Sequence, residues 1–420
     1  MTPPDVLTAL RKVCGQDHAR QARAEDAVHG ASAGWVASPA TTDEVGEVMR
    51  VAAEYSLRVV ARGSGGKLDW GAPPRSVDLV LDTTRLRGVV EHAAGDLVAI
   101  VRAGTPLYAL AAAVSPYRQR LALDDPVGGG TVGGAVATNA SGPLRLRYGT
   151  PRDLLIGITV VRADGVVAHS GGKVVKNVAG YDLGKLFTGS YGTLGIITEA
   201  VFRLHPLPAG QVFVQREVAS PAEAERLIRA VAHSQVGPAA VELDWPSTAG
   251  PGTLALLVEG HPAALQARMR GAGQLLEPDA AASVEPPVWW GRHPAGPSEI
   301  TLKITYPTAE LATVLHALNT TAASYGLHPA SRGSVASGVL YVGLGRGIDP
   351  GAAGEFVGDL RAALAAHEGS VVVLRAPAAI AGAVDVWGPV PEPALALMRR
   401  VKDQFDPEHR CAPGRFVGGI

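Results

Sequence analysis

Cysteine is scarce in this chain of 420 residues, which contains only Cys14 and Cys411. Two thiols exclude a disulfide framework and a four-thiolate iron–sulfur site. An excess of one charge is also missing, because 38 Lys and Arg stand against 39 Asp and Glu, for a net charge of -1. Such a chain lacks the strongly basic face that nucleic acids or a polybasic membrane anchor require. We therefore exclude nucleic-acid binding from the expected functions.

Long apolar runs are absent as well. The charge-free window 126–144 contains six glycines and two prolines, whereas a membrane span needs ~20 predominantly apolar residues. The first residues show no basic region followed by an apolar stretch, so no signal peptide is expected. The sequence predicts a soluble, cytoplasmic protein that would reach a membrane only through partners.

Glycine, in contrast, is abundant: its 51 residues are about 12% of the chain, against a usual ~7%. Four glycines lie in 63–71 and sixteen lie in 128–195. Clustered glycines with small neighbours often mark backbone that approaches a ligand closely. Either loop alone is equally typical of an ordinary turn. Two such loops in one domain, the first flanked by Arg62 and Lys67, favour an anion-binding nest for a phosphate group.

Two other nucleotide motifs fit less well. Residues 128–133 match the pattern G-x-G-x-x-G, but a dinucleotide fingerprint needs a buried strand before it and a helix after it. Here 124–126 read Asp-Asp-Pro, and 139–143 would stop any helix within two turns. A P-loop also fails, because Ala61 and Leu68 stand where it needs Gly and Ser or Thr. A nicotinamide dehydrogenase remains the less favoured alternative.

Hydrophobic periodicity predicts a mixture of helices and short strands in the first half. Thr41, followed three residues later by Glu44, is typical of a capping box that opens a helix through about Tyr55. Asp164-Gly165 between two apolar runs is typical of a hairpin turn. The strands expected here are 57–61, 78–82, 97–102, 154–162, 166–169 and 195–204, and a further helix is expected to start at Thr105-Pro106.

A proline pair at 206 and 208 marks the expected boundary of the first domain. Beyond it, longer strand and helix units predict an α+β second domain with a largely antiparallel sheet. Residues 272–299 are expected to be a surface connection. Helices are expected from Ser220-Pro221, His261-Pro262 and Asp349-Pro350, and strands at 211–218, 241–245, 254–259, 339–344 and 370–375, with a strand–helix unit over 300–327.

The glycine segments resemble a known flavoprotein family. Residues 62–71 look like the pyrophosphate loop of the FAD-binding domain shared by flavoproteins of the vanillyl-alcohol oxidase and p-cresol methylhydroxylase (PCMH) type. Residues 131–142 resemble the second FAD segment of that domain. Tyr148-Gly149 with Asp153, then 180–183 and 189–198, follow in the order of the family, so that the resemblance covers roughly 30–210.

A closer resemblance is to the smaller, FAD-binding subunits of bacterial glycolate oxidases, through 67–71, 171–182 and 413–420. It implies an α+β fold in which a two-subdomain PCMH-type FAD-binding domain precedes an α+β cap domain with a largely antiparallel sheet. The expected divisions are an N-terminal helical segment at 1–29, the FAD-binding domain at 30–208, the cap or substrate-side domain at 209–400, and a tail at 401–420 that returns to the FAD domain.

The resemblance also implies where FAD binds. Its pyrophosphate would lie between 63–66 and 133–134, its adenine near 195–198, and its isoalloxazine would face the second domain. Many relatives bind flavin covalently through His or Cys, but the first loop here has neither, so non-covalent FAD is expected. The cofactor residues so implied are Arg62, Gly63, Ser64, Gly65, Gly66, Lys67, Leu68, Thr131, Gly133, Gly134, Asn139, Ser141, Gly142, Tyr148, Gly149, Asp153, Gly195, Ile197 and Thr198.

The function implied by the resemblance is that of a subunit of a glycolate oxidase or dehydrogenase complex. Such a subunit would oxidise glycolate, a small 2-hydroxy acid, to glyoxylate and pass electrons to a larger flavin subunit and an iron–sulfur subunit. An alternative is an accessory subunit that binds flavin or relays electrons and has no substrate site. Lys173, Lys176 and Lys185 would serve a partner interface, flank FAD, or simply face solvent.

Flavin oxidation of a 2-hydroxy acid needs a base for the hydroxyl proton and a cation for the carboxylate. Lys303 and Arg375, on apolar expected strands, are candidates for groups that face the flavin; Arg is the usual bidentate carboxylate partner. Equally, both side chains would suit a solvated sheet face. The 12 His show no pair at three- or four-residue spacing, so no metal site is predicted, and no catalytic residue is assigned.

Overall fold

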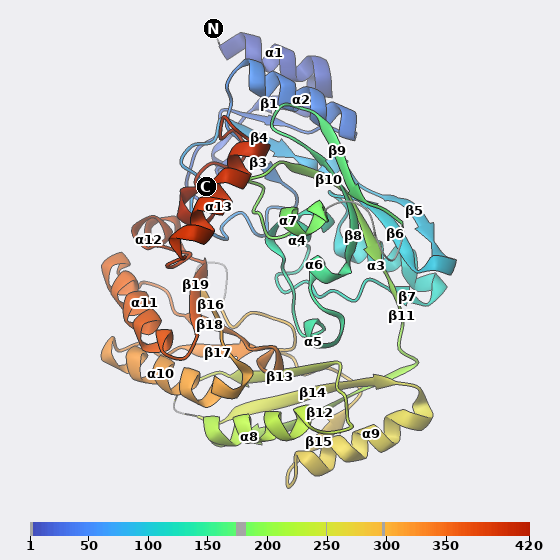
Figure 1. Ribbon diagram of the computed structural model, residues 1–420, viewed down its shortest axis with the longest axis vertical. Coiled ribbons are helices and arrows are strands. Elements are labelled where there is room, and N and C mark those ends of the chain that lie inside the picture. The colour runs from blue at the N-terminus through green and yellow to red at the C-terminus, as the bar shows by residue number, and fades with distance from the viewer. Residues whose placement is uncertain (1–2, 174–181, 249, 296–298) are drawn as a thin grey trace. The chain divides into compact units, whose positions relative to one another are not determined.

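The computed structural model describes residues 3–173, 182–248, 250–295 and 299–420 (Figure 1). The part of the resemblance at 174–181, with Lys176, lies outside these residues. The chain forms two compact units, which we call unit 1 and unit 2. Unit 1 comprises Met1–Ala140, Thr150–Leu207 and Pro389–Ile420, and unit 2 comprises Ser141–Gly149 and Pro208–Gly388.

The N-terminal part of unit 1 is a small sheet of strand order β1-β2-β4-β3, in which β2, β4 and β3 run parallel. The expected capping residue begins α2, where Thr41 Oγ1 accepts a hydrogen bond from the Glu44 N–H at 3.1 Å. The elements are α1 (Pro3–Cys14), β1 (Ala19–Gln21), β2 (Trp35–Ala37), α2 (Thr42–Glu54), β3 (Val59–Arg62) and β4 (Leu79–Asp82), with the 3₁₀ helices η1 (Gln16–His18), η2 (Ala24–Asp26) and η3 (Thr83–Arg85).

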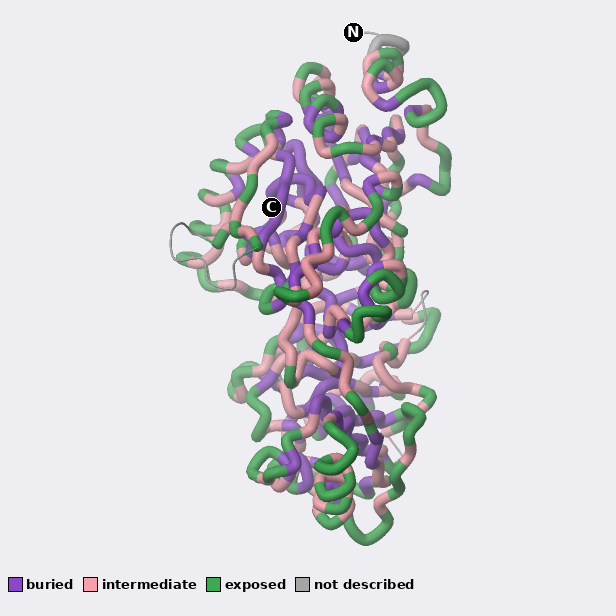
Figure 2. Tube along the Cα trace, turned by 90° about the vertical axis from the view of Figure 1, so that its right-hand side faces the viewer, coloured by how far each residue is buried: buried purple, intermediate pink, exposed green. Residues whose placement is uncertain are grey.

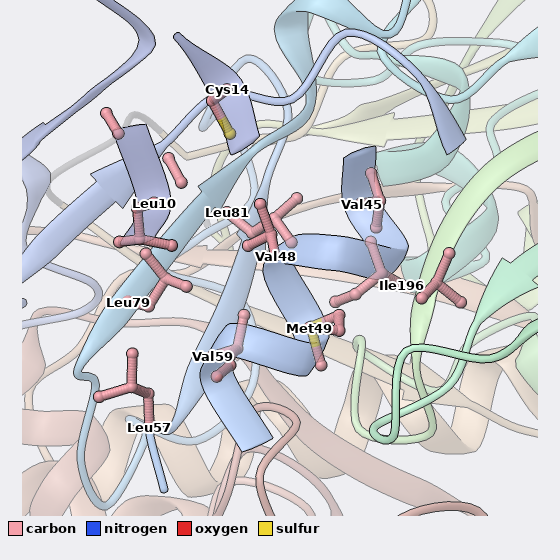
Figure 3. Close-up of a cluster of buried hydrophobic side chains, with 14 of the residues drawn as sticks. Leu10, Cys14, Val45, Val48, Met49, Leu57, Val59, Leu79, Leu81 and Ile196 are labelled. Carbon is pink, nitrogen blue, oxygen red and sulfur yellow. The ribbon is translucent and has the colours of Figure 1, made fainter. Parts of the chain in front are cut away.

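Apolar side chains from α1, α2 and this sheet form one buried core of unit 1. Figure 3 shows Val48 and Met49 of α2 among Leu79 and Leu81 of β4, with Leu10 of α1 beside them. All five are fully or almost fully buried. Burial of each such side chain stabilises the folded state by about 1.5–3 kcal/mol, so this core fixes the position of β3 and of the glycine loop that follows it.

A second sheet of unit 1 is antiparallel, with strand order β5-β6-β10-β8-β9. The expected hairpin joins β8 and β9, and Gly165 takes the positive φ of 79° that its turn requires. The strands are β5 (Val89–Ala93), β6 (Val98–Arg102), β7 (Gln119–Arg120), β8 (Leu155–Val161), β9 (Val167–Gly171), β10 (Ile196–Arg203) and β11 (His205–Pro206). The helices are α3 (Leu107–Val114), α4 (Val132–Thr138), α6 (Pro151–Leu154), α7 (Leu183–Phe187), α13 (Glu392–Phe405), η4 (Ala94–Asp96), η5 (Ser115–Tyr117) and η8 (Val417–Gly419).

The described residues of unit 2 form an eight-stranded sheet of order β15-β12-β14-β13-β17-β18-β16-β19, and every pair in it is antiparallel, as the sequence predicts. Its strands are β12 (Gly210–Val218), β13 (Ala240–Trp245), β14 (Gly252–Gly260), β15 (Ala281–Ser283), β16 (Ile300–Thr305), β17 (Ala330–Gly333), β18 (Val339–Leu344) and β19 (Ser370–Arg375). Its helices are α5 (Arg145–Tyr148), α8 (Pro221–Ala232), α9 (Pro262–Leu275), α10 (Leu311–Ser324), α11 (Pro350–Ala365), α12 (Ala378–Ala383), η6 (Thr308–Glu310) and η7 (Val335–Ser337).

The three proline-initiated helices of unit 2 begin where the sequence predicts. Ser220 and Asp349 accept hydrogen bonds from first-turn N–H groups, and Pro221, Pro262 and Pro350 are the first helical residues. In contrast, the stretch 272–299 is more than a connection, because it completes α9 and supplies the edge strand β15. The short sequence Ala-Ala-Ser of β15 carries no apolar alternation that would have indicated a strand.

The C-terminal residues are fixed to unit 1 by a buried ion pair. Lys402 Nζ lies 2.6 Å from Asp406 Oδ2 and donates to the carbonyl oxygens of Thr193 and Cys411 at 2.6 and 3.0 Å. Both charged side chains are fully buried. The tail then forms a parallel bridge between Cys411 and Val59 of β3. Figure 2 shows the buried stretches of the chain in purple and the exposed stretches in green.

Candidate functional site

A pocket in unit 1 brings together segments that are far apart in the sequence. The loop 63–68 forms one wall, and Thr131 with Gly134 forms another. Tyr191 and Arg415 complete the lining, together with Val60, Ala61, Ala137, Thr138 and Gly192. A second pocket shares Ala61, Gly63, Gly134, Ala137 and Gly192 with the first and adds Thr83, Ala103, Gly133, Gly195 and Ile197, so the two hollows adjoin.

The glycines in this lining are required by close packing. A Cβ at Gly63 would overlap the Thr131 hydroxyl, and a Cβ at Gly133 would lie 2.8 Å from the Cβ of Ala103. Gly65 takes a φ of +84°, which residues with side chains rarely adopt. The absence of side chains leaves backbone as the surface of the pocket. A cradle of this kind suits a ligand that the backbone must approach closely, such as a diphosphate.

Two cationic side chains line the pocket. Lys67 is 8% exposed, and its Nζ lies 3.8 Å from Asp125 Oδ1. Arg415 donates through Nη2 to the carbonyl oxygens of Leu68 and Trp70, at 2.8 and 2.7 Å. Burial lowers the pKa of Arg415 to about 10, which leaves the guanidinium protonated at neutral pH. Among the described residues that line the pocket, none is acidic, so its electrostatics favour an anion.

Arg415 is a site residue that the sequence analysis missed. The tail 413–420 was recognised only as part of the resemblance, and no local pattern connects it with the loop near Leu68, 347 residues earlier. The two hydrogen bonds from Arg415 to the loop explain how a C-terminal residue both contributes a charge to the pocket and holds one of its walls. Tyr191 was also missed as a lining residue, although it lies within the recognised segment 189–198.

Most of the expected cofactor residues lie in this lining. Backbone geometry places the first loop and the residues around Thr131 against one another, as the resemblance implies. The expected residues in the first pocket are Gly63, Ser64, Gly65, Gly66, Lys67, Leu68, Thr131 and Gly134, and those in the adjoining pocket include Gly133, Gly195 and Ile197.

Arg62 does not join the pocket lining. Its Nη1 donates to Asp26 Oδ1 at 2.9 Å and its Nη2 donates to Asp82 Oδ2 at 2.8 Å. The bond from Arg20, with smaller contributions from the Arg23 N–H and Arg62, lowers the pKa of Asp26 against the effect of burial. The guanidinium of Arg62 therefore ties β3 to η2 and β4, and Lys67 and Arg415 are the cations at the pocket.

Three other expected residues fix the backbone instead of lining the pocket. Asn139 ends α4 with a φ of 49°, which confirms that the helix stops within two turns, and its Oδ1 accepts from the Arg152 N–H at 3.2 Å. Asp153 caps α6: burial acts to raise its pKa, but hydrogen bonds from the Thr150 N–H and hydroxyl lower it. The buried Thr198 hydroxyl donates to the carbonyl oxygen of Thr159 at 3.3 Å.

Ser141, Gly142, Tyr148 and Gly149 belong to unit 2. The Tyr148 hydroxyl donates to Glu259 Oε2 at 2.7 Å, and the carbonyl oxygen of Ser141 accepts from the Tyr341 hydroxyl at 3.5 Å. Leu144 and Tyr148 also pack against a buried cluster that includes Phe213 and Leu257. These four expected residues therefore belong to unit 2, and the residues that line the two hollows of unit 1 do not include them.

Lys303 and Arg375 occupy one face of that sheet. Lys303 of β16 pairs with Tyr341 of β18, and Arg375 of β19 pairs with Thr301, two residues before Lys303. Directly opposed residues of antiparallel strands point to the same face, and so do residues two apart. Burial, and secondarily the charge of Arg145, lowers the pKa of Lys303 to about 8. Neither side chain is freely solvated, since both are only partly exposed.

Within the described ranges, no three His, Cys, Asp or Glu side chains come together in an arrangement that could hold a metal ion. No helix of the described residues has the length and apolar character needed to cross a membrane.

Two segments of the chain match known families. Residues 33–171 match the family described as FAD binding domain, and residues 389–416 match the family described as FAD linked oxidases, C-terminal domain. The first match contains the loop 63–68 and Thr131, and the second contains Arg415, so both contribute to the pocket lining.

Curated relatives match over part of their length. The chain is 38% identical to glycolate oxidase subunit GlcD of Bacillus subtilis over 41% of this chain and 37% of that protein. It is 40% identical to D-lactate dehydrogenase of Archaeoglobus fulgidus over 41% of this chain and 38% of that protein. It is 38% identical to glycolate oxidase subunit GlcE of Escherichia coli over 38% of this chain and 46% of that protein. The matches thus span less than half the length of these relatives.

The fold is similar to that of a solved flavoprotein over nearly the whole chain. p-Cresol methylhydroxylase with substrate bound has a TM-score of 0.78 and 14% identity, over 98% of this chain and 96% of the other. The PCMH-type fold and the antiparallel sheet of the second unit confirm the expected fold class. Residues 33–171, which carry the glycine loops, are thus similar to an FAD binding domain, and residues 389–416 are similar to the C-terminal domain of FAD linked oxidases.

Proposed function

We propose that the chain is an FAD-dependent oxidoreductase that oxidises the CH–OH group of a small 2-hydroxy acid to a 2-oxo acid. The observation that carries the proposal is the pocket of unit 1, where a glycine cradle and two buried cations stand in segments that match FAD-linked families. Relatives named for glycolate oxidase and D-lactate dehydrogenase support a 2-hydroxy acid as substrate. Glycolate is the substrate we favour.

The residues of unit 1 would hold FAD without a covalent bond. The backbone of 63–66 and of 133–134 would accommodate the diphosphate, with Lys67 and Arg415 as its counter-charges. Gly195 and Ile197 line the adjoining hollow, where we place the adenine end. The lining offers no His or Cys that could form a covalent flavin bond among its described residues. Bound FAD would supply the two-electron acceptor for the oxidation.

We also propose that the chain works beside a larger flavin subunit and an iron–sulfur subunit. The names of the relatives GlcD and GlcE describe subunits of glycolate oxidase, which supports an assembly of this kind. Two cysteines cannot ligate a four-thiolate cluster, so electrons would leave through oxygen, a quinone or a partner. Lys173, which pairs with Glu91, lies in the described part of the expected lysine group.

Anaerobic addition of glycolate or D-lactate to the FAD-loaded chain should bleach the visible flavin band. The reason is that a competent substrate delivers two electrons to FAD, which remain there when oxygen is excluded. The measurement is the absorption spectrum during titration, with acetate as the matched control, because acetate has the carboxylate but no oxidisable hydroxyl. Bleaching only after partner subunits are added would contradict autonomous oxidation and support the accessory role. A colourless chain that responds to NAD would contradict the proposal as a whole.

A further inference from the structure

A row of polar side chains crosses the centre of the sheet in unit 2. The register opposes Asp244 to Arg332, Arg332 to Tyr341, and Tyr341 to Lys303, on four adjacent strands. Opposed residues share a face, so the four side chains follow one line across β13, β17, β18 and β16. At one end of the line the charges are matched, since Arg332 Nε donates to Asp244 Oδ1 at 2.8 Å. At the other end, Lys303 is followed by Val372 of β19.

The side chain of Arg145, from α5, acts on the unmatched end of this row. It hydrogen-bonds the Tyr341 side chain, and its charge acts on both Tyr341 and Lys303. Its Nη1 atom is buried and has no hydrogen-bond partner among the described residues. The ring of His293 stacks on that of Tyr341 with centroids 4.2 Å apart, so that an aromatic wall stands beside the two cations.

Three buried acidic side chains of unit 2 already have other partners. Glu242 accepts from the Ser334 hydroxyl, Glu259 accepts from the Tyr148 hydroxyl, and Asp244 holds Arg332. Neither Arg145 nor Lys303 forms an ion pair with an acidic side chain in the described parts of the chain. Two neighbouring cations withdrawn from water repel each other and are costly unless an anion accompanies them. An anionic ligand beside Arg145 and Lys303 would therefore be stabilised by both charges.

We propose that Arg145 and Lys303 bind the carboxylate of the 2-hydroxy acid substrate, with Tyr341 holding Arg145 in place. This inference rests on the proposed function and names the residues that would recognise its substrate. The buried Nη1 of Arg145 would donate to one carboxylate oxygen, and the ammonium group of Lys303 would face the other. Arg375 shares the face but lies opposite Thr301, two residues before Lys303 on β16 and outside the row.

The charge of Lys303 predicts how anion binding depends on pH. Because burial and the charge of Arg145 lower the pKa of Lys303 to about 8, its ammonium form predominates below that pH and is lost above it. Anion affinity should therefore be strongest below about pH 8 and decline as the pH rises through that value. The other charged or titratable groups that face this end are Arg145 from α5, Tyr341 from β18, Arg332 with Asp244 from β17 and β13, Arg375 from β19, Glu242 from β13, and His293 stacked on Tyr341.

Calorimetric titration with oxalate, a carboxylate that carries no oxidisable CH–OH group, tests the site in the FAD-loaded chain. Arg145→Gln and Lys303→Met should each weaken oxalate binding about 10- to 100-fold, the usual range for a hydrogen bond to a charged group. Arg145→Lys should restore part of the affinity. Arg346→Gln is the matched control, since the Arg346 side chain is 69% exposed and lies on the same unit. Its oxalate affinity should equal that of the unsubstituted chain.

The outcomes separate this site from the proposed function. Unchanged oxalate affinity in both Arg145→Gln and Lys303→Met, with FAD content and unfolding midpoint retained, would overturn the site. Oxalate binding that depends on Arg145, in a chain whose flavin no 2-hydroxy acid reduces, would support an anion site while contradicting the proposed oxidation. Affinity that is constant from pH 7 to 9.5 would contradict the role of Lys303.

Discussion

Replacing Asp406 by asparagine should lower the free energy of unfolding by about 3–5 kcal/mol, the usual cost of removing one partner of a buried ion pair. Asp406 is fully buried and accepts from Lys402 Nζ and from the backbone N–H groups of Arg410 and Cys411 at 2.6, 2.9 and 2.6 Å. The amide would leave the Lys402 ammonium buried without a counter-charge. Urea unfolding followed by circular dichroism measures the loss.

Asp403 provides the matched control for this substitution. It lies on the same helix, is 55% exposed and pairs with His409, so Asp403→Asn should cost no more than about 1 kcal/mol. The double substitution of Lys402→Met with Asp406→Leu should recover only part of the loss, because it removes both charges together but leaves the N–H groups of Arg410 and Cys411 without their acceptor. Equal unfolding midpoints for Asp406→Asn and Asp403→Asn would contradict the account of the C-terminal attachment.

Substitution of Arg415 by glutamine should weaken FAD binding about 10- to 100-fold. Arg415 holds the glycine loop through the carbonyl oxygens of Leu68 and Trp70 and places a protonated guanidinium in the pocket lining. Hydrogen bonds to charged groups contribute about 1.5–3 kcal/mol each, and each 1.4 kcal/mol is a tenfold change in affinity. The measurement is a titration of the apo chain with FAD, followed by quenching of flavin fluorescence.

Two variants show whether the loss comes from the pocket. Arg399→Gln removes a half-exposed arginine of the same C-terminal segment, paired at its surface with Glu392, and should leave FAD affinity unchanged. Arg415→Lys keeps the charge but not the planar guanidinium that reaches two carbonyl groups. Its FAD affinity should lie between that of Arg415→Gln and that of the unsubstituted chain. An FAD dissociation constant for Arg415→Gln equal to that of the unsubstituted chain would contradict the assignment of Arg415 to the cofactor pocket.

Local patterns predicted the elements that local interactions determine. The capping side chains at Thr41, Ser220 and Asp349 open helices where the sequence indicates, because each oxygen satisfies an N–H group only two or three residues away. The glycine loop 63–66 was also predictable from the sequence, because a cluster of glycines leaves the backbone without covering side chains. The Asp-Gly hairpin at Gly165 belongs to the same class of signal.

Tertiary partners determined what the sequence could not show. Arg62 follows a strand and precedes the glycine loop, a position from which an arginine could bind a phosphate group. Its guanidinium instead forms ion pairs with Asp26 and Asp82, which lie 36 and 20 residues away in the chain. Asp153 lies close to the motif in sequence, but Thr150 stands three residues before it, and this spacing is itself a capping signal that would have identified its role. Arg145 carried no local signal at all.

Lys303 and Arg375 of unit 2 were predictable in part: the sequence indicates their position on the sheet but not their surroundings. Lys303 and Arg375 each interrupt an apolar strand, which is why the sequence indicates them as candidates to face the flavin. The structure places both on one face of the sheet. The pattern could not indicate that the charge of Arg145, from the segment 141–149, acts on Lys303, because that segment is continuous in sequence with unit 1. A charged residue within an apolar strand indicates which face of the sheet carries polar groups. The residues packed over that face determine which groups the charge can interact with.

The most direct test of the account is the release of flavin from the FAD-loaded chain by acid precipitation. The purified chain should bind one FAD in the pocket formed by 63–68, Thr131 and Arg415, and acid denaturation should return all of the yellow colour to the supernatant. Colour that stays with the precipitated protein would contradict non-covalent binding, and a chain that takes up no FAD would contradict the pocket itself.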